Sequence, residues 1–174
     1  MLQKYSRYKL LEQFFDCPRK SFHIREISRK ISLALISVIN HLDALCKEGL
    51  VLKEKGTIYN VFKANRENPK FKLLKQQNII WRIHTSGFIS SIEETTHPTC
   101  IILFGSASRG EDTDQSDIDI FIQAKESPIP LAKYEKSLNR KINLLFEPDL
   151  KTLSKELLNN LINGKILSGY LKAV

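Results

Sequence analysis

The chain has 174 residues, 42% of them hydrophobic, which allows one large domain or two small domains with buried cores. Its formal net charge is +8, and residues 1–68 hold 13 Lys and Arg against 7 Asp and Glu, whereas residues 99–174 are balanced. Short apolar runs argue against a membrane span, and three widely spaced cysteines argue against a disulfide framework. We therefore expect a cytoplasmic globular protein without a membrane partner. Its basic N-terminal part favours a polyanion, or else simply a soluble surface.

Helical periodicity predicts three helices in the N-terminal part, followed by a hairpin. The helices are expected over residues 3–15, 24–31 and 34–48. Gly49 is placed as the C-terminal cap of the third helix. The hairpin strands are expected at 50–52 and 57–62, around a turn at 53–56.

The stretch IREISRKISLALISVINHLDALCKEGLV, together with this hairpin, resembles a winged helix-turn-helix domain over residues 1–65. In the DNA-binding version of that fold, the early part of the third helix enters the major groove. There, Ser37 and Asn40 are the side chains that can hydrogen-bond base edges. Lys53 and Lys55, expected at the hairpin tip, complete the candidate DNA-binding set. The resemblance therefore implies duplex DNA as a partner of residues 1–65.

Three apolar residues on the same part of the third helix leave a second interpretation open. Leu35, Ile36 and Ile39 could touch thymine methyl groups or form a protein interface. After this domain, residues 66–98 are expected to form one connecting helix that starts at Asn68-Pro69 and kinks or packs tightly at Gly87.

Residues 99–174 are expected to form the second domain, and its first half carries the candidate site. Cys100–Phe104 suits a buried strand that ends at the turn Gly105-Ser106. Ala107-Ser108 could start a helix whose first N–H groups bind an anion. In Ser116–Ile122 apolar and acidic residues alternate, so Asp117 and Asp119 share one face, roughly 6.6 Å apart. Two such carboxylates can hold Mg²⁺ against a triphosphate, although they could also be only a strand's solvent face.

Gly105-Ser106, ten further residues and then Asp117-x-Asp119 resemble the nucleotidyltransferase superfamily of DNA polymerase beta, especially its minimal branch. The resemblance implies an α+β fold with a small mixed sheet flanked by helices. It also implies transfer of a nucleoside monophosphate from a triphosphate, with ATP expected, and two Mg²⁺ ions on Asp117 and Asp119. Gly105 and Ser106 would bind phosphates. Arg109 would reach a phosphate or pair with Glu111 or Asp112.

The second half of this domain departs from the superfamily pattern at one position. A helix is expected at 131–138, a strand at 141–146, a helix at 149–161 and an edge strand at 165–167. The superfamily usually supplies a third carboxylate from the middle strand of this set, and here Asn143 takes that place. An amide carries no charge and cannot accept a proton. Glu147 lies four residues further on, roughly 13 Å away along a regular strand.

Two main functions remain open on the sequence. The first is a Mg²⁺-dependent nucleotidyltransferase joined to a DNA-binding domain, with Asn143 predicting slow transfer or nucleotide binding alone. Antitoxin-like relatives suggest a partner protein of the toxin type as acceptor. The second is a DNA-binding transcriptional regulator whose C-terminal domain senses a nucleotide. An interaction scaffold built on the apolar third helix is a further alternative. The oligomeric state is left open, and a dimer is compatible with the sequence.

Overall fold

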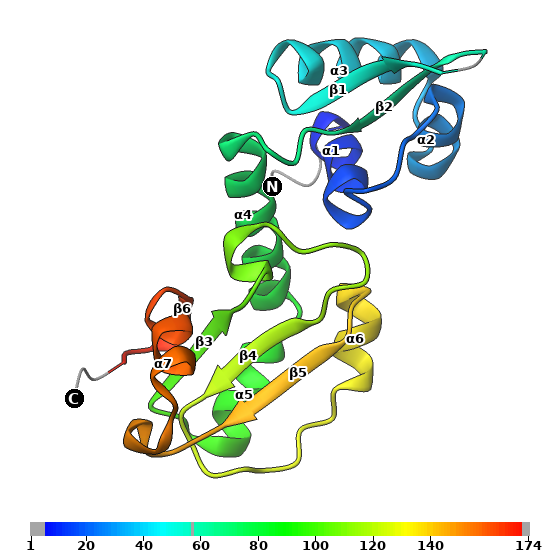
Figure 1. The fold of residues 1–174 in the computed structure, drawn as a ribbon. Coiled ribbons are helices and arrows are strands. Elements are labelled where there is room, and N and C mark those ends of the chain that lie inside the picture. Colours follow the sequence, from blue (N-terminus) through cyan, green and yellow to red (C-terminus); the bar gives the residue numbers. More distant parts are fainter. Residues whose placement is uncertain (1–5, 57, 172–174) are drawn as a thin grey trace. The chain divides into compact units, whose positions relative to one another are not determined.

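The computed structural model describes residues 6–56 and 58–171 (Figure 1). The chain divides into two compact units, Met1–Lys75 and Gln76–Val174. Residues 3–5 and Thr57, which the sequence pattern assigns to the first helix and to the second hairpin strand, lie outside the described residues. Among the residues described, we find no helix with the length and apolar content needed to cross a membrane.

The N-terminal unit consists of three helices followed by a two-stranded hairpin. They are α1 (Ser6–Asp16), α2 (Ile24–Ile31), α3 (Leu35–Lys47), β1 (Val51–Lys55) and β2 (Asn60–Ala64). Ser32 takes a left-handed conformation with φ of 53° and ends α2, as expected from the break at this point. Gly49, with φ of 72°, lets the Leu50 N–H donate to the Leu45 carbonyl, which confirms it as the residue that ends α3.

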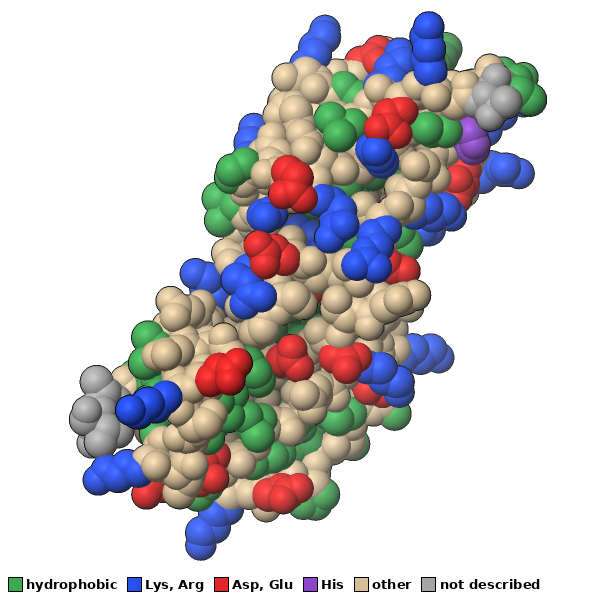
Figure 2. Space-filling view, viewed as in Figure 1, with side chains coloured by type: hydrophobic (Ala, Val, Ile, Leu, Met, Phe, Trp, Pro, Cys, Tyr) green, Lys and Arg blue, Asp and Glu red, His purple; other side chains and the backbone are tan. Residues whose placement is uncertain are grey.

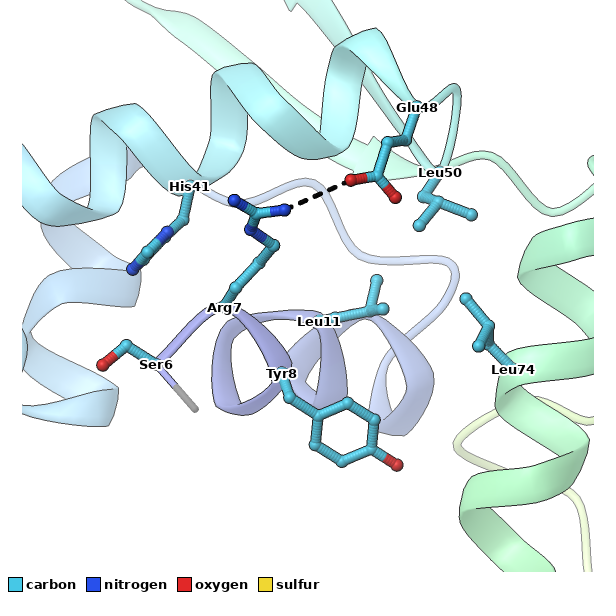
Figure 3. Close-up of a pocket in the computed structure, with 8 residues that line it drawn as sticks. All are labelled: Ser6, Arg7, Tyr8, Leu11, His41, Glu48, Leu50 and Leu74. Carbon is cyan, nitrogen blue, oxygen red and sulfur yellow. Dashed lines mark hydrogen bonds and ion pairs between the residues drawn. The ribbon is translucent and has the colours of Figure 1, made fainter. Parts of the chain in front are cut away.

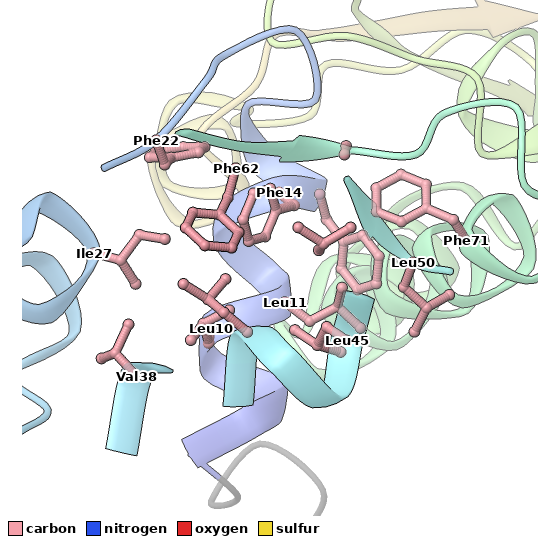
Figure 4. Close-up of a cluster of buried hydrophobic side chains, with 14 residues drawn as sticks. Leu10, Leu11, Phe14, Phe22, Ile27, Val38, Leu45, Leu50, Phe62 and Phe71 are labelled. Carbon is pink, nitrogen blue, oxygen red and sulfur yellow. The ribbon is translucent and has the colours of Figure 1, made fainter. Parts of the chain in front are cut away.

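Phenylalanine rings and aliphatic side chains together form the core of this unit (Figure 4). The rings of Phe14 and Phe22 lie 5.3 Å apart edge to face, and Phe15 lies 5.2 Å from Phe71, at the start of α4. The backbones of Phe22 and Phe62 exchange two hydrogen bonds of 2.8 and 2.9 Å, so the linker before α2 pairs with the hairpin. This pairing fixes which face of the hairpin is buried.

The hairpin register differs from the expected one. The chain reverses between Lys55 and Asn60, so the turn predicted at residues 53–56 is wrong by about three residues. Lys53 and Lys55 lie within β1 opposite Phe62 and Asn60, and not at the tip. Burial of Phe62 in the core sets this register, since a shift by one residue would turn that ring to solvent.

The expected single connecting helix over residues 66–98 is two helices. The first is α4 (Pro69–Thr85), whose first turn is capped because the Lys70 N–H donates to Asn68 Oδ1 at 2.8 Å. The second is α5 (Phe88–Thr96). Gly87 separates them with φ of 76°, and the Ser86 hydroxyl accepts a hydrogen bond from the Phe88 N–H. A left-handed residue cannot continue an α-helix, which explains the break.

The C-terminal unit is built around a four-stranded mixed sheet. Its strands are β3 (Cys100–Phe104), β4 (Ile118–Ile122), β5 (Ile142–Phe146) and β6 (Lys165–Gly169). Their order is β5-β4-β3-β6, in which β4 and β5 run parallel and the other neighbours antiparallel. The remaining elements are α6 (Ala132–Leu138), α7 (Lys155–Ile162) and the 3₁₀ turns η2 (Ala107–Arg109) and η3 (Leu150–Thr152).

Both faces of this sheet are covered, and each face has its own apolar cluster (Figure 1). Ile101, Ile118 and Ile120 pack with residues of α5 and α6 on one face. Cys100, Ile102 and Phe121 pack on the other face with Leu150 and with Leu161 of α7. This three-layer arrangement agrees with the expected small mixed sheet flanked by helices.

One further helix differs from its prediction. The segment expected as a single helix over residues 149–161 begins with η3 and continues as α7 only from Lys155. Asp149 accepts a hydrogen bond from the Lys151 N–H, and the Ser154 hydroxyl accepts one from the Leu157 N–H. Each of these side chains starts its own helical segment, because an N-cap residue itself adopts an extended backbone.

Candidate functional site

The centre of the candidate site is a pair of side chains on neighbouring parallel strands. Asp119 of β4 stands in register with Asn143 of β5, and Asn143 Nδ2 donates to Asp119 Oδ1 at 3.2 Å. Side chains alternate along a strand, so both lie on the same sheet face as Phe121. Asp119 is half-buried and Asn143 is exposed. The pair is therefore open to a ligand.

Gly105 approaches this pair from the end of β3. Phe104 is in register with Asp119, and Gly105 follows it with φ of 70°. A Cβ atom at Gly105 would lie 2.5 Å from Asp119 Oδ2, closer than real Cβ contacts allow. Glycine therefore suits this position twice: another residue would strain the backbone, and its Cβ would push the Asp119 carboxylate aside.

The segment after Gly105 forms a tighter structure than the sequence suggests. Ala107–Arg109 is a single 3₁₀ turn, so the helix expected to start at Ala107-Ser108 is absent. The Ser106 carbonyl accepts hydrogen bonds from the N–H groups of Arg109 and Glu111, and the buried Ser108 hydroxyl donates to the Gly105 carbonyl at 2.8 Å. Local hydrogen bonds replace the helix and hold Gly105 and Ser106 in a compact turn.

Arg109 pairs with Glu111, as one of its two expected alternatives has it, and its expected contact with a phosphate stays a prediction. Its Nε donates to Glu111 Oε2 at 2.9 Å, and both side chains are about half exposed. An ion pair of this kind contributes little to stability because water screens it. Arg109 is therefore held only weakly and can exchange Glu111 for another anion at small cost.

The loop between Gly110 and β4 contains a charged pair that the sequence analysis missed. Arg140, just before β5, donates through Nη1 to Asp112 Oδ2 at 2.9 Å and also to the Thr113 carbonyl. Only 9% of the Arg140 side chain and 6% of the Asp112 side chain are exposed. Removing one partner of a buried ion pair strongly destabilises a protein, because the other charge stays buried. The sequence names Asp112 only as a possible partner of Arg109 and does not indicate Arg140, because its pattern places both among polar loop residues.

The same loop positions Asp117, which lies one residue before β4 and is exposed. On its N-terminal side, the Thr113 N–H donates to the Ser116 hydroxyl at 2.9 Å. On its C-terminal side, the Ile118 N–H donates to the Lys141 carbonyl at 2.8 Å. Asp117 is thus held between a closed turn and the first hydrogen bond between β4 and β5.

Glu147 does not supply the missing carboxylate. It follows the last residue of β5, whereas Asn143 is the second residue of that strand. Glu147 Oε1 accepts a hydrogen bond from the Asp149 N–H at 3.1 Å, and the Glu147 N–H donates to the Ile122 carbonyl. Over the described ranges 6–56 and 58–171, no three His, Cys, Asp or Glu side chains gather in a metal-binding group. The candidate donors are therefore two carboxylates and the amide of Asn143.

In the N-terminal unit, the expected DNA-binding residues are partly accessible. Ser37 is half-buried, while Asn40, Lys53 and Lys55 are exposed. The exposed outer surface of α3 also carries the apolar residues noted in the sequence and the acidic Asp43. Figure 2 shows Lys and Arg side chains interspersed with acidic ones on the visible face of this unit. The charge on this visible face is thus mixed.

Described residues of the N-terminal unit line a larger and a smaller surface pocket. The larger, about 520 Å³, lies between α1 and α3 and is crossed by an ion pair of 3.3 Å between Arg7 and Glu48 (Figure 3). The smaller, about 410 Å³, is lined by residues of the linker before α2, of α2, of α3 and of the hairpin: His23, Ile24, Arg25, Leu35, Ile39, Tyr59 and Asn60. The second pocket is the more apolar of the two in side-chain composition.

Comparison with known proteins bears on the C-terminal unit. The family described as "Polymerase beta, Nucleotidyltransferase" matches residues 88–169. No curated protein and no solved structure matches the chain significantly. The matched range begins at the first residue of α5 and ends at the last residue of β6, and it contains Gly105, Asp117, Asp119 and Asn143. This match supports the nucleotidyltransferase superfamily for residues 88–169, and with it nucleotidyl transfer as the general class of reaction.

Proposed function

We propose that the C-terminal unit binds a nucleoside triphosphate together with Mg²⁺, and that it transfers the nucleotidyl group slowly if an acceptor is present. The observation that carries this proposal is the group formed by Gly105, Asp119 and Asn143. A turn with a close backbone approach lies against a carboxylate, and an amide stands where a third carboxylate is expected. ATP is the proposed triphosphate.

The donor set fits Mg²⁺ in the presence of phosphates. Mg²⁺ prefers oxygen ligands and is often held by one or two carboxylates plus the phosphates of its substrate. Asp117 and Asp119 supply that number. When bound, the ion neutralises phosphate charge and polarises the phosphoryl oxygens. The expectation of two ions remains a prediction, because two carboxylates provide less negative charge than such a pair usually receives.

The chain's own residues account for the expected slow transfer. The Gly105-Ser106 turn would bind phosphate oxygens, and Arg109 would exchange Glu111 for a phosphate. Asn143 can orient Asp119 through their hydrogen bond, but its amide cannot take a proton from an attacking hydroxyl. A general base typically contributes on the order of 10²–10⁴-fold. The site therefore supports binding and positioning more strongly than proton transfer.

The test uses the full chain with ATP labelled at the α-phosphate and Mg²⁺. We expect a rise in melting temperature with Mg²⁺ and ATP together, since a ligand that binds only the folded state stabilises it. Asp119→Ala should abolish that rise. Label transferred to a protein or nucleic-acid acceptor would support transfer, and nucleotide binding without any transfer would support the sensor alternative. An unchanged thermal shift in Asp119→Ala would contradict both.

For the N-terminal unit, we infer a winged helix-turn-helix arrangement from its three helices and the hairpin that follows them. The acceptor suggested by the antitoxin-like resemblance, a partner protein, rests on that resemblance alone. Duplex DNA was the expected partner because of the winged helix-turn-helix resemblance together with the basic charge of residues 1–68. The apolar side chains on the exposed face of α3 favour a protein ligand over DNA.

A further inference from the structure

The N-terminal unit exposes an unusual amount of apolar side chain around its smaller pocket. Leu35 and Ile39 of α3 line the pocket on one side, with 41% and 37% of their surface exposed, and Tyr59 lines it from the hairpin with 68% exposed. Ile36 and Ile58, the chain neighbours of two of these residues, are exposed by 74% and 80%. Monomeric proteins rarely leave such a group of large apolar side chains in water without a partner.

The pocket has mainly apolar walls, and a positively charged side chain, Arg25, lies at one end of it. Arg25 lines it, and among the described residues this side chain has no ion-pair partner. The nearby acid Glu26 is already paired with Lys20 at 2.5 Å, and this contact holds the pKa of Glu26 below its usual range. The unpaired charge at the α2 end of the pocket is therefore positive.

Two helices also begin at this pocket without a capping side chain. Neither His23 before α2 nor Ala34 before α3 makes a side-chain capping hydrogen bond. The first N–H groups of a helix then lack a side-chain acceptor, and the helix dipole is positive there. Ile24 and Leu35, the first residues of these helices, both line the pocket.

We propose that this groove, formed by the starts of α2 and α3 and by the hairpin, binds an acidic amphipathic helix of a partner protein. Leucine-sized side chains at helical spacing would enter between Leu35, Ile39 and Tyr59. Aspartate or glutamate side chains at the edge of that helix would meet Arg25 and the first N–H groups of α2 and α3. An amphipathic helix laid into an apolar groove is a common mode of peptide recognition.

Duplex DNA fits the same surface less well. Base recognition in the major groove needs side chains that donate or accept hydrogen bonds, whereas Leu35, Ile36 and Ile39 offer only methyl contacts. The surface is thus apolar with a positive end, and not a continuous polar reading surface.

The experiment measures binding of the full chain to a synthetic helical peptide of about five turns, with leucine along one face and glutamate along the other. The matched probes are the same peptide with lysine in place of glutamate, and a duplex oligonucleotide. We expect the acidic peptide to bind and the lysine peptide to bind at least about tenfold more weakly, because like charges meet Arg25. Failure of the acidic peptide to bind the unaltered chain would overturn the proposal.

Variants locate the binding surface. Ile39→Ser and Leu35→Ser should each weaken peptide binding by about tenfold or more, since each removes a large apolar side chain that the bound peptide would cover. Arg25→Ala should weaken it and reduce its dependence on salt. Leu52→Ser is the matched control, because Leu52 is 39% exposed on β1 outside the pocket, and it should leave binding unchanged. Circular dichroism checks that each variant is folded.

The two kinds of partner give opposite results. If the duplex binds more tightly than the acidic peptide and neither Leu35→Ser nor Ile39→Ser affects peptide binding, the surface is a nucleic-acid interface and the proposal is wrong. The proposal does not depend on nucleotide binding in the C-terminal unit. Its result can therefore be read whether or not Mg²⁺ and ATP bind there.

Discussion

Replacing Asn143 by aspartate tests how the candidate site is built. In the unaltered chain Asn143 Nδ2 donates to Asp119 Oδ1 at 3.2 Å. Asn143→Asp removes the donor and places a second carboxylate at nearly the same distance. The lost hydrogen bond costs about 1 kcal/mol. Two unit charges 4 Å apart repel by about 1 kcal/mol in bulk water and by more at lower dielectric.

Asn143 is exposed and Asp119 is half-buried, so the bulk-water value is the lower bound for this repulsion. We therefore expect Asn143→Asp to lower the free energy of unfolding by roughly 2 kcal/mol at neutral pH without a metal. Adding Mg²⁺ should offset this loss of stability in Asn143→Asp. Three carboxylates attract the ion more strongly than two, so the variant should gain more stability from Mg²⁺ than the unaltered chain does.

The assay is thermal unfolding at pH 7 with and without Mg²⁺, in parallel with nucleotide transfer. Asn143→Ala is the control, because it removes the same hydrogen bond without adding charge, and it should show the smaller loss of stability and no added response to Mg²⁺. Transfer by Asn143→Asp should exceed that of the unaltered chain, since aspartate can accept a proton. Equal responses of Asn143→Asp and Asn143→Ala to Mg²⁺ would refute the idea that residue 143 faces the metal position.

Three further predictions concern the residues that shape the site. Gly105→Ala should abolish the thermal shift caused by Mg²⁺ and ATP, because the new Cβ would displace Asp119. Gly87→Ala is the control, since Gly87 has a similar φ but no atom within 4 Å of an added Cβ. It should cost only the backbone strain of about 1–2 kcal/mol and keep the shift. Asp112→Ala should lower the free energy of unfolding, measured with denaturant, by about 3–5 kcal/mol, because the Arg140 charge stays buried without this carboxylate. Glu111→Gln removes the exposed Arg109–Glu111 pair and should lower it by less than about 1 kcal/mol. The Ile142 N–H and the Lys141 ammonium hold the pKa of Glu135 below its usual range, so its contribution to stability is present above pH 5 and lost as the pH falls through the lowered value. Glu135→Gln should therefore make the melting temperature fall less steeply between about pH 5 and pH 3, and an unchanged slope would contradict that role.

Local sequence signals were sufficient for much of the secondary structure. α2 spans the predicted residues, and β3 begins and ends where its apolar run does. Gly49 ends α3 as expected, because only a residue that tolerates positive φ can close a helix in that way. Each of these predictions depends on a few neighbouring residues, so the chain nearby contains all the information that decides it.

The predictions that failed depended on competition between local preferences and packing. The sequence places a turn at residues 53–56 because charged residues and a glycine gather there, yet the core position of Phe62 moves the reversal beyond Lys55. In the same way, Ser154 separates η3 from α7 inside a segment whose leucines have continuous helical spacing. Periodicity identifies the apolar face of a segment, but it does not say where the backbone hydrogen bonds start.

For the candidate site, the sequence alone determined the residue types and their spacing: a Gly-Ser turn, two aspartates with one residue between them, and an asparagine in place of a carboxylate. Only the tertiary structure decided that β4 and β5 run parallel with Asp119 beside Asn143, and that Arg140 reaches Asp112. These contacts join residues that are 24 to 28 positions apart. Strand order, register and burial create such contacts, and those follow from how the whole unit packs and not from any short stretch of its sequence.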